Sequence, residues 1–226
     1  MLYSIIVVLL IILIVCGWIW YYQLSPHNYP CIPLHEIAFR TGDLILFKPT
    51  DNWNAPRIAC WYTHIGVVYI HPDDSLHVPY IFEAMGTRGR YMLPHQNLSG
   101  IFLEPLAGRV TKYAGSVFIK RIHGPKIPDD VAREFMQLVH YAKENMYYEY
   151  SLGWNGLRKG LGLEKCNHGT NCGETVMLSL IKLGILPLSE YDIAHVHHLR
   201  NMCYLSDCTT GYIYDNPVQI VYDPFT

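Results

Sequence analysis

The fold of this chain is decided by one stretch, Asn171-Cys172-Gly173-Glu174-Thr175-Val176-Met177-Leu178-Ser179-Leu180-Ile181-Lys182-Leu183-Gly184, which predicts a complete helix. Asn171 is a favourable N-cap, and Glu174 stands three residues later, where the partner in a capping box belongs. Apolar residues recur at helical spacing after Glu174. Gly184 then provides the glycine that commonly follows the last residue of a helix. The pattern places Cys172 at the first helical position.

Cys172 is therefore a candidate nucleophile. The free N–H groups and the positive end of the helix dipole favour a thiolate at a helix start. The alternative is a small buried apolar side chain with no chemical role. The helix pattern alone leaves both interpretations open.

The overall composition bounds the class of protein. A length of 226 residues allows one domain with a substantial core and an appendage. The net charge of −2 is too small to indicate a polyanion as partner, so nucleic acid is not expected.

The N-terminal segment, residues 2–22, carries no charged side chain. As a helix it would be about 31 Å long, which matches the hydrocarbon core of a bilayer. Aromatic residues cluster at its C-terminal end, as in an interfacial belt: Trp18, Trp20, Tyr21 and Tyr22. The sequence predicts a single-pass anchor over residues 1–24, with the lipid bilayer as partner. A cleaved signal peptide is the alternative, but no Lys or Arg precedes the run, which is also long for such a peptide; the orientation is left open.

The remaining chain predicts an α+β domain over residues 41–226, preceded by a juxtamembrane linker over residues 25–40. Strands are expected first and helices afterwards, which is the order typical of this class. The expected strands are residues 44–47, 65–70, 80–84, 100–106 and 116–122, and the helices are 129–145, 172–184 and 189–199, followed by short closing strands at 212–214 and 218–222.

Three residues suggest chemistry: Cys172, His64 and Glu83. A nucleophilic Cys needs a base to take its proton, and the base needs a third group to orient it. His64 begins a β-branched strand, and Glu83 interrupts the apolar strand that follows. Pairing of these strands would bring the base and the acid together, and a helix packed across the sheet would bring the thiol.

Five short motifs occur in a recognisable order: Gly42-Asp43, Thr63-His64-Ile65-Gly66-Val67, Phe82-Glu83-Ala84, Tyr148-Glu149-Tyr150 and Asn171-Cys172-Gly173-Glu174. With them the chain resembles the circularly permuted papain-like hydrolases of the NlpC superfamily, in particular the YiiX-type branch. It is also similar to the related lecithin:retinol acyltransferase group around Cys172. In the permuted enzymes the His strand precedes the Cys helix.

The resemblance implies an antiparallel sheet packed on the Cys-bearing helix, and a role for each residue. Cys172 would be the nucleophile, His64 the base and Glu83 the orienting acid. The backbone N–H of Cys172 and the side chain of Tyr62 would stabilise the oxyanion. The reaction would be hydrolysis of an amide or ester, or acyl transfer, on a peptide or lipid substrate, and no cofactor or metal is expected.

The chain departs from the family pattern at two places. Gly173-Glu174-Thr175 stands where the branch has Ser-Glu-Leu, and Tyr148-Glu149 stands where it has Tyr-Asp. The second change leaves the substrate role of that acid open.

Two other functions remain as alternatives. Cys166, His168 and Cys172, with Cys203 and Cys208, would supply enough ligands for zinc, although their spacing is irregular for a structural site. The second alternative is an inactive membrane-anchored scaffold of the same fold.

Overall fold

A computed structural model describes residues 6–16, 29–49, 62–85, 100–145, 147–148, 169–187 and 205–222. It has the mixed α+β class that the sequence predicts. The elements in chain order are β1 (Cys31–Pro33), η1 (Leu34–Glu36), β2 (Leu44–Pro49), β3 (His64–Ile70), β4 (Pro79–Met85), β5 (Gly100–Pro105), α2 (Leu106–Thr111), β6 (Gly115–Lys120), β7 (Ile122–His123), α3 (Asp129–Asn145), β8 (Tyr147–Tyr148), β9 (Gly169–Thr170), α5 (Cys172–Lys182), β10 (Ile213–Tyr214) and β11 (Val218–Val221).

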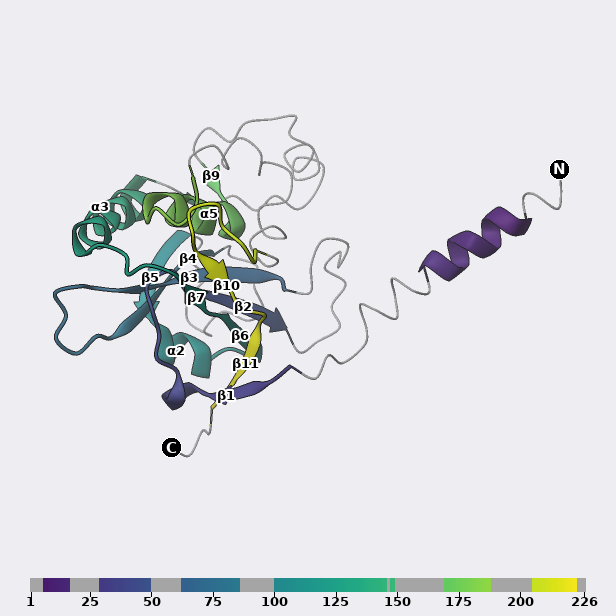
Figure 1. The fold of residues 1–226 in the computed structure, drawn as a ribbon, viewed down its shortest axis with the longest axis horizontal. Helices are drawn as coiled ribbons and strands as arrows, with labels where there is room; N and C mark the ends of the chain where they lie inside the picture. The colour runs from purple at the N-terminus through teal and green to yellow at the C-terminus, as the bar shows by residue number, and fades with distance from the viewer. Residues whose placement is uncertain are drawn as a thin grey trace.

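A seven-stranded sheet in the order β1-β11-β6-β2-β3-β4-β5 forms the centre of the molecule (Figure 1). The pairs from β11 to β5 are antiparallel, whereas β1 runs parallel to β11. Two small two-stranded sheets, β10-β7 and β8-β9, complete the described strands. The expected strands are thus confirmed, except that the segment expected as one strand over residues 116–122 is divided between β6 and β7, which lie in different sheets.

The central strands are apolar on both faces because helices cover both sides of the sheet. Leu44 and Leu46 of β2 pack in the core on the side of α3 and α5. Ile45 and Phe47 of the same strand pack in a second core on the side of α2. Figure 1 shows α3 and α5 on one side of the sheet and α2 on the other. This alternation assigns each strand residue to one of the two layers.

Helices α3 and α5 form where the sequence predicts them. In α5 the side chain of Asn171 accepts a hydrogen bond from the backbone N–H of Glu174, at 2.9 Å. The helix ends before Gly184, whose φ of 71° is in the left-handed region. Both helices bury apolar side chains against the sheet: Phe135, Val139 and Ala142 from α3, and Val176, Met177 and Leu180 from α5.

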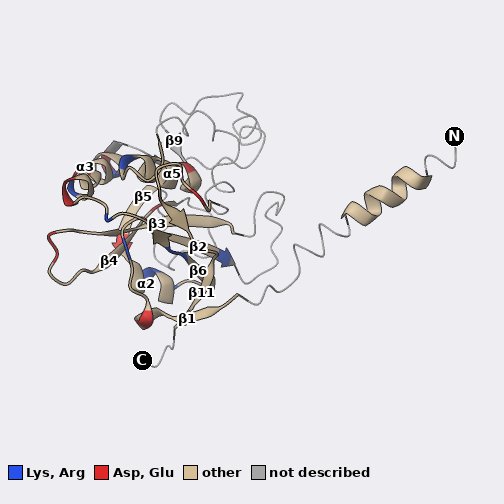
Figure 2. Cartoon of the chain, in the orientation of Figure 1, with Lys and Arg blue, Asp and Glu red and all other residues tan. Residues whose placement is uncertain are grey.

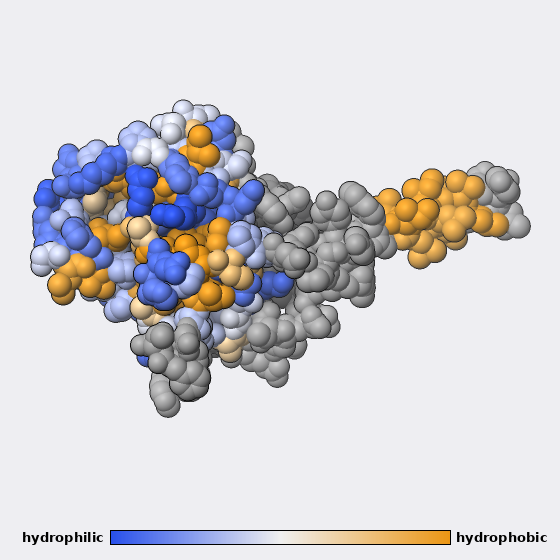
Figure 3. Space-filling model, turned by 60° about the horizontal axis from the view of Figure 1, so that its bottom comes forward, coloured by the Kyte–Doolittle hydropathy of each residue, from blue (hydrophilic) through white to orange (hydrophobic). Residues whose placement is uncertain are grey.

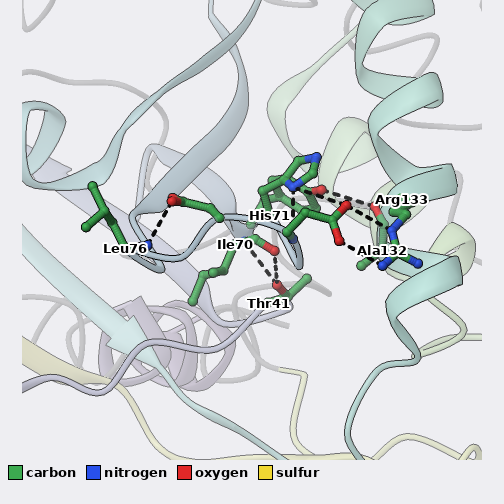
Figure 4. A network of polar contacts seen from close by, with 9 residues as sticks. Thr41, Ile70, His71, Leu76, Ala132 and Arg133 are labelled. Atoms are coloured by element: carbon green, nitrogen blue, oxygen red, sulfur yellow. Dashed lines mark hydrogen bonds and ion pairs between the residues drawn. The ribbon is translucent and has the colours of Figure 1, made fainter.

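The connection between β3 and β4 is tied to neighbouring elements by polar contacts (Figure 4). The guanidinium of Arg133 on α3 donates to both carboxylate oxygens of Asp73, at 2.8 and 2.9 Å. The buried hydroxyl of Tyr69 donates to the carbonyl of Ala132, at 3.2 Å. These contacts fix α3 against the far end of β3, opposite the end that begins with His64.

The N-terminal region differs in part from the expectation. Residues 31–33, expected in the linker over residues 25–40, form β1 at the edge of the sheet. Pairing of backbone groups requires no apolar pattern, and prolines are tolerated in an edge strand. The ordered domain therefore reaches back into the segment expected to be a linker.

The predicted membrane anchor is described only over residues 6–16, which are helical and exposed. Within the described ranges, no helix is long and apolar enough to cross a membrane. The flanking parts of the apolar segment, and the helix expected over residues 189–199, lie outside the described residues.

Candidate active site

His64 is the first residue of β3, and its imidazole lies beside a carboxylate from the next strand. Nε2 of His64 is 2.6 Å from Oε2 of Glu83 on β4. The ring also packs against Phe47 of β2, with the ring centroids 5.3 Å apart. His64 and Glu83 thus meet across adjacent strands, as the order of the strands predicts.

Glu83 is fully buried and has a second partner, Arg109 of α2. Nε of Arg109 donates to Oε1 of Glu83 at 2.6 Å, and Nη2 lies 3.4 Å from Oε2. Burial by itself raises the pKa of Glu83, but the charge of Arg109 and the contact with His64 outweigh it and lower the pKa below its ordinary value. Glu83 is therefore a carboxylate at neutral pH and only accepts hydrogen bonds. Nε2 of His64 must then carry the proton that they share.

Cys172 begins α5, and its thiol is buried, with 6% of the residue exposed. The thiol lies close enough to His64 to raise the pKa of its imidazole. Because Nε2 of His64 is already engaged by Glu83, Nδ1 is the ring nitrogen left to interact with the sulfur. The imidazole therefore stands between the thiol and the carboxylate.

The charge state of His64 follows from these neighbours. Burial lowers the pKa of the imidazole, but hydrogen bonds to Cys172 and Glu83 and the carboxylate charge raise it, with a net value of about 9. His64 is therefore an imidazolium at neutral pH. A helix start beside an imidazolium is the kind of environment in which nucleophilic cysteines occur.

The site joins the two layers of the molecule. His64 and Glu83 alternate along their strands with residues of the α3 and α5 core, so they project toward the α2 side. Cys172 belongs to the core on the α5 side. Because His64 is at the very start of β3, its ring lies at the strand end, where groups from both layers reach it.

The remaining residues predicted for the site have different positions. Tyr62 is buried in the same core cluster as Cys172, and its ring packs edge-on against Phe118, with centroids 5.4 Å apart. Tyr148 lies in β8, whereas Glu149 is outside the described residues. Of the alternative zinc ligands, only Cys172 and Cys208 are described. Both are buried, and no group of three or more metal-ligating side chains occurs in the described ranges.

Arg109 is the residue of this cluster that the sequence analysis missed. Its guanidinium is 7% exposed and lies 4.3 Å from the centroid of the Phe47 ring. The available signal was indirect, because a Glu in a buried strand requires a cationic or hydrogen-bonding partner. Nothing in the sequence indicated which of the basic residues supplies it.

No family model and no curated protein matches the chain. Among solved structures, the chain is similar to the crystal structure of the metalloprotein YiiX from Escherichia coli O157:H7, with 18% identity and a TM-score of 0.42. The match covers 64% of this chain and 66% of that chain. No fold, activity or metal of this chain follows from that similarity.

Proposed function

We propose that this chain is a thiol hydrolase or acyltransferase that acts on an amide or ester bond. The observation that carries the proposal is the position of the His64 ring, which contacts Glu83 through Nε2 and lies close enough to the thiol of Cys172 for that thiol to raise its pKa. Nucleophile, base and orienting acid are the three parts that covalent catalysis by cysteine requires.

The first half of the reaction forms a thioester. The Cys172 thiolate attacks the carbonyl carbon of the substrate, and the electron pair of the C=O bond moves to oxygen. As the tetrahedral intermediate collapses, the bond to the leaving group breaks, and Nδ1–H of His64 protonates the departing amine or alkoxide. The acyl group is then bound to Sγ of Cys172, and His64 is neutral.

The second half returns the enzyme to its starting state. Neutral His64 takes a proton from water or from an acceptor hydroxyl or amine, which attacks the thioester carbon. The C–S bond breaks, and the Cys172 thiolate and the His64 imidazolium are restored. Water gives hydrolysis, and another acceptor gives acyl transfer.

The oxyanion formed in both halves needs hydrogen-bond donors. The first N–H groups of a helix have no acceptor within that helix, so the backbone N–H of Cys172 is available in principle. Tyr62, buried in the same core cluster, is the proposed second donor. Within the permuted papain-like class that the motifs resemble, this arrangement has the expected chain order, with His64 and Glu83 before Cys172.

A membrane location is the second part of the proposal. The helix of residues 6–16 exposes only apolar side chains in the view of Figure 3, including Leu10, Leu13 and Ile14. An apolar helix of this kind is unfavourable in water and is expected to continue into a membrane span. By contrast, acidic and basic residues are interspersed over the described elements of the domain (Figure 2). A site held near a bilayer favours a lipid or lipidated substrate over a diffusing peptide.

The membrane location is tested by alkaline carbonate extraction of membranes that contain the full chain. The chain should remain in the pellet, and a variant without residues 1–24 should be released. Full-length chain in the supernatant would contradict the anchor.

The chemistry is tested by alkylation of the full-length chain with iodoacetamide at pH 6.5, followed residue by residue with mass spectrometry. Cys172 should react faster than Cys31, although Cys31 is exposed and Cys172 is buried, because only Cys172 has an imidazolium neighbour. His64→Ala should slow the labelling of Cys172 by about tenfold or more. The matched control is His123→Ala, which removes an exposed imidazole paired with Asp215 at 2.7 Å.

Two results would reject the nucleophile. One is labelling of Cys172 at the rate of Cys31 or slower in the wild-type chain. The other is an equal rate for Cys172 in the wild type and in His64→Ala. Either result would leave the inactive scaffold as the better account of this fold.

A further inference from the structure

We infer that Arg109 is a positioning residue of this site, which fixes the Glu83 carboxylate so that its Oε2 meets Nε2 of His64 and holds the imidazole in place beside Cys172. The inference rests on the proposed function, because a positioning role has meaning only if the His64 and Cys172 pair is reactive. It assigns a task to a buried cation that touches none of the reacting atoms.

The geometry separates the two oxygens of the carboxylate. Oε1 of Glu83 receives the short bond from Nε of Arg109, at 2.6 Å, and Oε2 receives the short contact with His64, also at 2.6 Å. Nη2 of Arg109 is farther from Oε2, at 3.4 Å. Because each oxygen has its own close partner, rotation of the carboxylate would break both contacts at once.

Arg109 is itself held in place by its surroundings. Its guanidinium lies over the rings of Phe47 and Tyr113, at 4.3 and 5.5 Å from their centroids, and Nη2 lies 3.6 Å from Sδ of Met85. Phe47 also packs against the ring of His64. The ring of Phe47 thus packs against both Arg109 and His64, the two residues that contact the Glu83 carboxylate.

The other ionisable groups near Glu83 come from several elements. Glu104 of β5 is half-buried, and burial and the Glu83 charge raise its pKa, while Arg109 and Lys112 oppose that shift. His64 comes from β3 and Cys172 from α5. Among these described neighbours, two cations contact the Glu83 carboxylate: Arg109 at Oε1 and the imidazolium of His64 at Oε2.

The first test compares Arg109→Met with Arg133→Met in the full-length chain. Arg133 is a matched control, since it also binds a carboxylate through Nε and Nη2, at Asp73, but lies at the other end of β3. The readouts are the alkylation rate of Cys172 at pH 6.5 and the NMR signal of the His64 Nε2–H. Arg109→Met should slow alkylation at least tenfold and move the Nε2–H signal upfield, and Arg133→Met should change neither.

Arg109→Lys separates position from charge. Lysine keeps the charge but lacks the planar fork that binds a carboxylate in a fixed orientation. Only partial recovery of the alkylation rate and of the Nε2–H signal is expected. Full recovery by Arg109→Lys would overturn the positioning role, because charge alone would then suffice.

Arg109→Met leaves the buried Glu83 carboxylate without its arginine partner, and the variant can fail to fold for that reason. A double-mutant cycle covers this case. Glu83→Gln removes that charge, so the variant with both changes has no buried ion to compensate. If Arg109 acts only through Glu83, adding Arg109→Met to Glu83→Gln should change the alkylation rate less than twofold. An undiminished effect of Arg109→Met in the Glu83→Gln background would overturn the inference.

Failure of the inference is distinguishable from failure of the proposed function. Slow alkylation of Cys172 in the wild-type chain rejects the nucleophile, whatever the variants do. Fast alkylation in the wild type, together with an unchanged rate and an unchanged Nε2–H signal in folded Arg109→Met, rejects only the role of Arg109.

Discussion

Nε2 of His64 lies 2.6 Å from Oε2 of Glu83, and the two residues come from neighbouring antiparallel strands. The pairing of β3 with β4 runs from Ile70 and Pro79 to Val67 and Phe82, and His64 and Glu83 lie just beyond its last pair. His64 is still paired with Phe47 of β2, so its ring lies at the end of a strand inside the sheet. The contact between His64 and Glu83 therefore lies at the start of β3, near β4 and the start of α5.

Stability should depend on pH through His64. Its pKa is raised from 6.5 to about 9 in the folded chain, so the imidazolium favours the folded state. This contribution is fully present below pH 6.5 and is lost as the pH rises through about 9. At most it amounts to about 3 kcal/mol of the free energy of unfolding. Denaturant unfolding at a series of pH values should show the decline in the wild type and a flatter curve for His64→Gln; equal slopes between pH 6.5 and 9.5 would contradict the shift.

Gly66 should resist substitution because it lies in β3, directly against side chains of β4. A Cβ at Gly66 would meet Cδ1 and Cγ1 of Ile81 at 2.6 Å and Cβ of Glu83 at 3.2 Å. Ile81 is fully buried, so it has little room to move. Gly66→Ala should lower the free energy of unfolding by about 1–3 kcal/mol. It should also slow the alkylation of Cys172 by displacing Glu83.

Gly108→Ala is the matched control for Gly66→Ala. A Cβ at Gly108 would have no heavy atom within 4 Å, and alanine suits the interior of α2 better than glycine. This variant should be as stable as the wild type or slightly more so. Adding Ile81→Ala to Gly66→Ala should restore the alkylation rate, and a failure to do so would show that the clash with Ile81 is not the cause.

The free energy of unfolding should also depend on pH through Asp43, in a lower pH range than for His64. Its carboxylate is buried and accepts hydrogen bonds from the backbone N–H groups of Ile122 and Arg40, both at 2.8 Å. Burial raises the pKa from 3.8 to about 6, although these bonds oppose the shift. The raised pKa contributes stability below pH 3.8, and the contribution disappears as the pH rises through about 6.

Asp43→Asn should remove this dependence. The side chain of asparagine has one acceptor oxygen, so one of the two backbone N–H groups loses its partner, at a cost of about 1–3 kcal/mol. The stability deficit of Asp43→Asn should therefore be larger at pH 4 than at pH 7. Asp207→Asn, at an exposed carboxylate, is the control and should run parallel to the wild type. A constant deficit from pH 4 to pH 7 would contradict the raised pKa of Asp43.

The sequence predicts those parts of the fold that local patterns encode. The cap at Asn171 and the apolar repeat after it specify α5, and the acidic start and apolar face specify α3. The neighbouring strands of His64 and Glu83 follow from the short connection between them. The catalytic roles of these residues stay predictions, because the positions of side chains do not establish a reaction.

Other parts of the fold depend on tertiary contacts and leave no local pattern. Helix α2 has six residues, follows Pro105 without a side-chain cap and contains Gly108. It forms because Leu106 and Val110 pack into the second core, and that packing also delivers Arg109 to Glu83. In the same way, β1 is held by backbone pairing with β11, which the sequence of three residues with a proline does not indicate.

The start of the domain should lie at β1. Cys31, Ile32 and Pro33 pair with residues 219–221, and the backbone N–H of Gln219 donates to the carbonyl of Pro30 at 2.9 Å. Ile32 and Leu34 also pack against the second core. A variant without residues 1–28 should therefore keep the full stability of the domain, whereas a variant without residues 1–34 should lose about 2–4 kcal/mol from the apolar contacts alone.

The measurement is denaturant unfolding of the two deletion variants, with circular dichroism to confirm that both are folded. Loss of β1 also leaves the backbone groups of β11 unpaired at a new sheet edge, so the longer deletion should self-associate more readily in analytical ultracentrifugation. Ile32→Ala in the shorter variant is an intermediate control, because it removes apolar contact but keeps the backbone pairing. Equal midpoints for the two deletions would mean that β1 adds nothing to the sheet, and the domain would then begin after residue 34.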